Sequence, residues 1–197
     1  MKLASNYKSD NFETIRGKNI LVVSRTPQNS IRKSYEEQIS KALRAKGINA
    51  TASHFIFPDL EPLTNKTVDR ITNTIAMFRK EGFDILLLTS LKDIEEQEVL
   101  RREGEYITML DYYSNKYITL KGYYDDVHAP PKLGPRETQL EPVTEKSVTF
   151  ILEAVTYNLA LVPDQRLLSV ITTKTTNPSS GRAVRTSFAN LIAEELK

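Results

Sequence analysis

The stretch NILVVS, Asn19 to Ser24, sets the fold class because it is an apolar strand with no polar face. A second stretch of this kind, DILLLTSL, spans Asp84 to Leu91. Strands that are apolar on both sides usually lie in the centre of a sheet that is covered on both faces. Together the two stretches predict an α/β fold.

Two helices and one further strand are predicted between these stretches. Apolar residues recur at helical spacing in two segments, and Gly47 and Gly82 end them. The first stripe comprises Ile31, Tyr35, Ile39, Ala42 and Leu43, and the second comprises Val68, Ile71, Ile75 and Phe78. Thr64 is the expected N-cap of the second helix. Between the helices, the alternation in INATASHFIF, Ile48 to Phe57, predicts a half-buried strand.

The order of these elements predicts a β-α-β-α-β start followed by a different arrangement. Right-handed crossovers place the half-buried strand on one side of the Ile20 strand and the Ile85 strand on the other. Towards the carboxyl end, Val148 to Val162 and Leu167 to Thr176 predict an antiparallel hairpin, and a last helix is expected to begin at Asn177-Pro178. The predicted fold is therefore mixed α/β, with a three-layer arrangement around about five strands and with three helices.

The chain divides into a short polar segment and one domain. Residues 1–17 are polar and unpatterned, which predicts a flexible tether. The segment 18–197 is long enough to form one substantial hydrophobic core, so a single α/β domain is expected there.

Composition argues against several classes of function. Lys and Arg total 27 against 25 Asp and Glu, a net charge of +2, and no basic run is present, so nucleic-acid binding is not expected. The chain has no cysteine, which excludes disulfides, cysteine metal sites and a thiol nucleophile. Its longest apolar runs fall far short of the roughly 20 residues that a membrane-spanning helix requires.

Motifs for catalysis, cofactors or metals are weak. The first strand is followed by RTPQNS in place of a glycine-rich loop, so a phosphate site of that type is not expected. His54 lies on the apolar side of its predicted strand, which favours a structural histidine over a catalytic base. Asp126 and His128, with Asp125 beside them, could begin a metal site, but no third ligand is evident. The acidic stretch EEQE with Asp93 is typical of a solvated charged edge. No catalytic residue, cofactor or metal is therefore predicted.

A tyrosine-rich segment is the predicted partner surface. EYITMLDYYSNKYITLKGYYDD, Glu105 to Asp126, fits either a helix or strands. Tyr side chains are enriched at interfaces because they bring apolar area and freeze few torsions, although they also cover sheet edges. The candidate contact residues are Tyr106, Tyr112, Tyr113, Tyr117, Tyr123 and Tyr124.

Several segments carry a resemblance to a known group. KNILVVS, IRKSYEEQISKALRAKGINA, EGFDILLLTSLKD and the closing TYNLALVPDQRLLSV together resemble small Gram-negative cell-envelope lipoproteins of undefined function. The similarity spans Lys18 to Lys197, and Val170 stands where an aromatic residue is common in the group. The group is similar in fold to the amino-terminal α/β domain of TolB. Its members are exported and anchored through a lipidated amino-terminal cysteine, which this chain lacks, so an outer-membrane anchor facing the periplasm is inferred here from the resemblance alone.

The resemblance implies a non-enzymatic envelope domain that binds another envelope component, expected to be a protein. The alternative is an α/β enzyme or a small-molecule-binding domain. Open parallel sheets place ligands at the carboxyl ends of their strands, so this alternative assigns a pocket to Arg25, Thr26 and Ser90 after the Ile20 and Ile85 strands.

Overall fold

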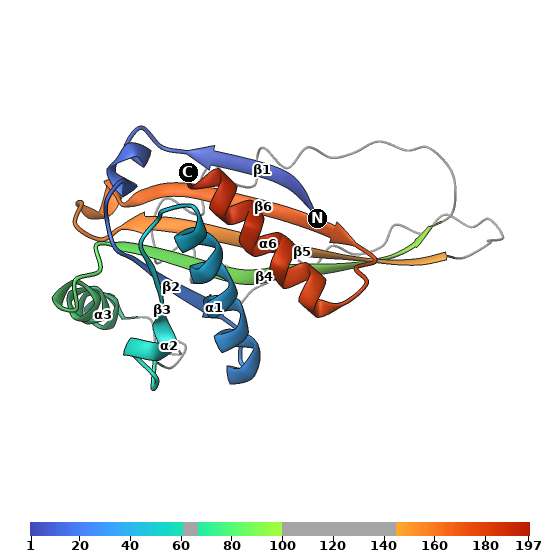
Figure 1. Ribbon diagram of the computed structural model, residues 1–197, viewed down its shortest axis with the longest axis horizontal. Coiled ribbons are helices and arrows are strands. Elements are labelled where there is room, and N and C mark those ends of the chain that lie inside the picture. Colours follow the sequence, from blue (N-terminus) through green and yellow to red (C-terminus); the bar gives the residue numbers. More distant parts are fainter. Residues whose placement is uncertain (61–66, 100–144) are drawn as a thin grey trace.

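The computed structural model describes residues 1–60, 67–99 and 145–197, and within them six strands form one mixed sheet (Figure 1). The strands are β1 (Lys2–Lys8), β2 (Ile20–Arg25), β3 (Ala50–Ala52), β4 (Ile85–Val99), β5 (Glu145–Asn158) and β6 (Leu167–Thr176). The described helices are α1 (Asn29–Ala45), α2 (Ser53–Ile56), α3 (Val68–Lys80) and α6 (Gly181–Glu195), with 3₁₀ turns η1 (Phe12–Ile15) and η2 (Pro163–Gln165). The spatial order is β1-β6-β5-β4-β2-β3, which confirms the predicted mixed α/β class.

The parallel half of the sheet has the predicted arrangement. Strand β2 pairs in parallel with β3 on one side and with β4 on the other. Its side chains from Ile20 to Val23 are buried, as expected for a strand that is covered on both faces. The predicted order of these three strands in the sheet is therefore confirmed.

Helices cover the two faces of the sheet unequally. Helices α1 and α6 lie beside each other on one face, where Ile39, Leu43 and Phe188 belong to a single buried cluster with β2, β4, β5 and β6 (Figure 1). Helix α3 covers the other face, where Ile75 and Phe78 are buried with a second cluster from β2, β4, β5 and β6. The sheet is thus the middle of three layers.

The antiparallel half confirms the predicted hairpin and corrects its ends. Strands β5 and β6 pair antiparallel, but β5 ends at Asn158, whose side-chain oxygen accepts a hydrogen bond from Ala160 N at 3.0 Å. The last helix begins at Gly181, later than predicted, because Ser180 Oγ accepts from Ala183 N at 3.1 Å as its N-cap. Asn177, the predicted start, has φ of 45° and holds Val148 N through its side-chain oxygen at 2.8 Å.

Residues 1–17 are structured, which corrects the expectation of a flexible tether. Strand β1 pairs antiparallel with the outer edge of β6, and the aromatic ring of Phe12 and the side chain of Ile15 are buried in the core. The pattern of side chains did not reveal β1 because nearly all of them are exposed. Backbone pairing alone places this strand.

The segment from Ile48 to Phe57 departs from the predicted strand. Strand β3 contains only Ala50–Ala52, and the chain then turns into the short helix α2. The N-cap of α3 is Thr67, whose hydroxyl accepts from Arg70 N at 3.4 Å, and the predicted cap Thr64 lies outside the described residues. Among the helices of the described ranges, none is both long and apolar enough to span a bilayer.

Truncating a core residue of the β5-β6 hairpin should destabilise the protein strongly. Leu168 is fully buried, so Leu168→Ala should lower the free energy of unfolding by about 2–5 kcal/mol. Val162 lies in the connection of the same hairpin and is 59% exposed, so the control Val162→Ala should change it by less than about 0.5 kcal/mol. Urea denaturation checks both values, and equal losses would contradict the assigned core.

The ion pair between Lys46 at the end of α1 and Glu194 of α6 should be detectable in the pKa of Glu194. Lys46 hydrogen-bonds to the Glu194 carboxylate and its positive charge adds to the effect, which lowers the pKa of Glu194 below its ordinary value of 4.5. Because the folded pKa is lowered, the contact stabilises the fold above the unfolded pKa, and the contribution is lost as the pH falls through the folded pKa. An NMR titration should show the pKa of the Glu194 carboxyl rising towards its ordinary value in Lys46→Met, while the nearby Lys197 charge continues to lower it.

Candidate functional site

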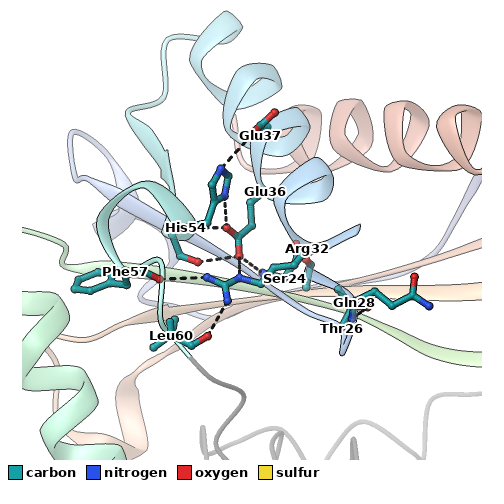
Figure 2. Close-up of polar contacts among 11 residues, drawn as sticks. Ser24, Thr26, Gln28, Arg32, Glu36, Glu37, His54, Phe57 and Leu60 are labelled. Atoms are coloured by element: carbon teal, nitrogen blue, oxygen red, sulfur yellow. Dashed lines mark hydrogen bonds and ion pairs between the residues drawn. The ribbon is translucent and has the colours of Figure 1, made fainter. Parts of the chain in front are cut away.

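One buried carboxylate organises the ends of three neighbouring elements. Glu36 lies in the second turn of α1, and its side chain is fully buried. Ser24 near the end of β2 and His54 in α2 lie around it (Figure 2). Ser53, the first residue of α2, also contacts it. These residues meet because β2 and β3 are parallel neighbours, so the segments that follow them lie at the same edge of the sheet.

Both oxygens of the Glu36 carboxylate accept hydrogen bonds. Oε1 accepts from Ser24 N at 3.1 Å and from Ser53 Oγ at 2.8 Å. Oε2 accepts from His54 N at 3.0 Å and lies 2.8 Å from His54 Nδ1. A buried charge is tolerated when its desolvation is offset by such donors. Glu36 thereby joins α1 to the end of β2 and to α2.

Arg32 supplies the opposite charge and extends the connection. Its Nε donates to Glu36 Oε1 at 3.1 Å from one helical turn earlier. Its two remaining nitrogens donate to backbone carbonyls after α2, Nη1 to Leu60 O at 2.7 Å and Nη2 to Phe57 O at 3.3 Å (Figure 2). The planar guanidinium can make all three bonds at once, which an ammonium group could not do in this geometry. Glu36 therefore attaches the start of α2 to α1, and Arg32 attaches the residues that follow α2.

The His54 ring has a structural partner, as predicted. A carboxylate can only accept, so the Nδ1 that faces Glu36 carries the hydrogen. The Nε2 atom lies 3.2 Å from Glu37 Oε1, although the two atoms are not aligned for a hydrogen bond. The nearby Ser53 hydroxyl donates to Glu36 and not to His54, so this trio does not form the serine, histidine and carboxylate order of a nucleophilic site.

The attached helix α2 presents apolar side chains to solvent. Phe55 is 66% exposed, and its ring lies against the His54 ring with 4.2 Å between centroids. Ile56 is also exposed, as is Ile31 in the first turn of α1, the helix that α2 contacts. We call Phe55 and Ile56 the α2 surface. Its position is fixed from beneath by buried hydrogen bonds, so few degrees of freedom remain to be lost on binding.

The alternative pocket residues are only partly brought together. Arg25 and Ser90 lie opposite each other in the β2-β4 register. Ser24 and Thr89, one residue earlier on each strand, hydrogen-bond at 2.8 Å on the side of Glu36, so alternation directs Arg25 and Ser90 to the opposite face. Thr26 follows the end of β2, and its hydroxyl accepts from Gln28 N at 3.4 Å. The small-molecule alternative stays a prediction.

The other predicted candidates have separate outcomes. The tyrosines from Tyr106 to Tyr124, and Asp125, Asp126 and His128, lie outside the described residues, so their roles stay predictions. Within the described part of EEQE, Glu95 pairs with Lys174 at 3.4 Å, as expected for a charged edge. Across residues 1–60, 67–99 and 145–197, no group of three His, Asp or Glu side chains is arranged so that it could hold a metal ion.

Sequence reasoning missed Arg32 and Glu36, although a signal was present. The two residues are four apart, the spacing of a helical ion pair. They also lie on the same face as Ile39 and Leu43, the apolar stripe of α1. A charged pair on a buried stripe predicts a polar connection within the core, because an unpaired charge there would be too costly.

Comparisons with known proteins gave structural likenesses only. No family model matches the chain, and no curated protein sequence matches it. A PelC dodecamer from Paraburkholderia phytofirmans is similar with a TM-score of 0.45 at 14% identity, covering 98% of this chain and 94% of that one.

Two further solved structures are similar over most of their length. The lipoprotein GNA1162 from Neisseria meningitidis has a TM-score of 0.39 at 13% identity, covering 91% of this chain and 99% of that one. A DUF4136 family protein from Bacteroides thetaiotaomicron has a TM-score of 0.32 at 12% identity, covering 98% and 91%. Identities and TM-scores this low assign no function to the chain.

Replacing the buried carboxylate should destabilise the fold. In Glu36→Gln, the amide nitrogen faces donors that need an acceptor, and Arg32 loses its counter-charge, so the free energy of unfolding should fall by about 3–5 kcal/mol. Glu37 is the adjacent residue and is largely exposed, so Glu37→Gln should cost less than about 1 kcal/mol. Chemical denaturation of both variants measures the difference, and a tolerated Glu36→Gln would show that the Glu36 charge does not hold these elements together.

Proposed function

We propose that this chain is a non-enzymatic binding domain of the bacterial cell envelope, and that the α2 surface contacts a protein partner. The observation that carries the proposal is an exposed aromatic residue held on a rigid support. Phe55 is 66% exposed on a helix that Glu36 and Arg32 fix to the core. Aromatic residues are enriched in the buried centres of interfaces.

Preorganisation of the α2 surface favours binding. A large apolar side chain in solvent contributes nothing to folding, whereas its burial against a partner removes its surface from water. The buried bonds of His54 hold α2 in place before binding, and the His54 ring supports the Phe55 ring from one side. The ordering cost of binding is therefore small, which favours a recognition role for this surface.

The envelope assignment is supported by the sequence resemblance from Lys18 to Lys197. That resemblance implies export, an outer-membrane lipid anchor on the periplasmic side, a fold related to the amino-terminal domain of TolB, and a protein partner. The tyrosine-rich segment belongs to the same proposal as a second contact region. No nucleic acid and no cofactor are part of it.

A double substitution on the α2 surface should weaken partner capture without unfolding the domain. We expect Phe55→Ser with Ile56→Ser to reduce the amount of envelope protein cross-linked to the purified chain by at least about tenfold, equivalent to about 1.4 kcal/mol. Because both side chains are exposed, the melting temperature should remain that of the parent chain. Capture is measured by mass spectrometry after cross-linking in an envelope fraction.

The matched control is Val162→Ser, which removes an apolar side chain of similar exposure from a distant turn and should leave capture unchanged. The double variant Tyr123→Ala with Tyr124→Ala tests the tyrosine-rich segment separately from the α2 surface. Loss of capture in that variant alone would move the contact surface to the tyrosine-rich segment. Loss in neither double variant would contradict the binding proposal for both regions.

A further inference from the structure

Among the open backbone edges of the sheet in its described part, which include that of β3, two carry opposite charge. One is the outer edge of β1, and the other is the part of β4 that continues beyond β2. Open strand edges present unpaired N–H and C=O groups that can pair with another chain. Neither edge belongs to the α2 surface, so the inference below does not rest on the proposed function.

The β1 edge is basic and exposed. Among the described strands, β1 pairs only with β6, so its second side is open. Lys2 and Lys8 lie at its two ends and are exposed, with exposed Leu3 and 51% exposed Tyr7 between them. This edge therefore combines positive charge with apolar side chains.

The second edge is acidic. Pairing of β2 with β4 ends at Ser90, whereas β4 continues to Val99 with β5 as its described neighbour. We call Leu91–Val99 the β4 arm; it projects from the body of the sheet (Figure 1). Its sequence carries Asp93, Glu95, Glu96 and Glu98 against one basic residue, Lys92, which pairs with Glu153 of β5. The side chains of Leu91 and Ile94 are exposed.

The charges disfavour pairing between identical edges. A two-fold antiparallel pair of β1 strands centred on Ser5 would bring Lys2 opposite Lys8 of the second copy, and like charges in opposed positions are destabilising. Two β4 arms would bring acidic residues together in the same way. Charge at an edge is a common device against unwanted pairing, and it still permits a partner of the opposite sign.

We propose that β1 of one copy of this chain adds to the β4 arm of a second copy and so extends the sheet between molecules. The strand directions fit, since β1, β6, β5 and β4 are successively antiparallel and β1 therefore runs opposite to β4. Copies in the same orientation would pair these edges antiparallel. Each strand has one register shift within the contact, between Leu3 and Ser5 in β1 and between Leu91 and Asp93 in β4. Because the two extra residues compensate, a register that places Tyr7 opposite Leu91 still places Lys2 opposite Glu96, so apolar and charged pairs form together.

This contact joins two different surfaces, so it is heterologous. A pair of copies keeps one free edge of each kind, so repetition gives a closed ring or an open filament, depending on the angle between neighbours. The pairing depends partly on exposed charges, which salt screens. Association should therefore increase with protein concentration and decrease with ionic strength.

A charge exchange between the two edges tests the contact. Sedimentation velocity at low and high salt should show salt-sensitive association of the parent chain, and both Lys2→Glu and Glu96→Lys should reduce the associated fraction at least about tenfold. An equimolar mixture of the two variants should restore association, because the acidic edge of one then meets the basic arm of the other and the remaining two edges keep their original charges. Lys33→Glu and Glu81→Lys are controls with the same changes in net charge at exposed positions of α1 and at the end of α3.

Three outcomes overturn the proposal. A parent chain that is monomeric at all concentrations would show that the edges do not pair. Association that persists in both variants would place the interface elsewhere, and failure of the mixture to recover would show that the two charges do not meet. Unchanged melting temperatures are required of both variants. Should either variant unfold, Tyr7→Lys, at an exposed position of β1, tests the same edge and should also abolish association.

Discussion

The buried charge of Glu36 is the constraint on which the carboxyl edge of the parallel strands depends. A carboxylate removed from water must receive hydrogen bonds, and this one receives them from β2, from α2 and from Arg32 on its own helix. To supply these donors, the chain must leave β3 after Ala52 and turn into α2. One polar requirement thus sets the length of a strand, the position of a helix and the direction in which Phe55 points.

Much of the fold could be predicted because its central strands are buried on both faces. Ile20 to Val23 and Ile85 to Leu88 are continuous apolar runs, and the helices around them have apolar stripes that end at Gly47 and Gly82. Strand β1 could not be predicted in this way, since its side chains stay exposed and only its backbone pairs with β6. Periodicity reports which face is buried, so an edge strand without a buried face leaves no signal.

The candidate site shows a different limit. Alternation from Ile48 to Phe57 predicted a longer strand because local pattern could not take account of a carboxylate from α1. That His54 has a buried polar partner was expected, but the identity of the partner was not, because Glu36 comes from a separate element. The Arg32 and Glu36 spacing on the apolar stripe was the available signal, and it identifies the ion pair without identifying the backbone groups that the pair holds.

The two proposed surfaces would support each other if both operate. Edge pairing between copies uses β1 and the β4 arm, whereas partner contact uses the exposed side chains of α2. An assembly would repeat the α2 surface once per copy with a fixed spacing. Because linked sites raise the effective concentration for each further contact, individually weak contacts at Phe55 could then give durable attachment to a partner that is itself repeated. Rigid attachment of α2 by Glu36 and Arg32 matters for this effect, since mobile contact surfaces would lose the geometric match between repeats.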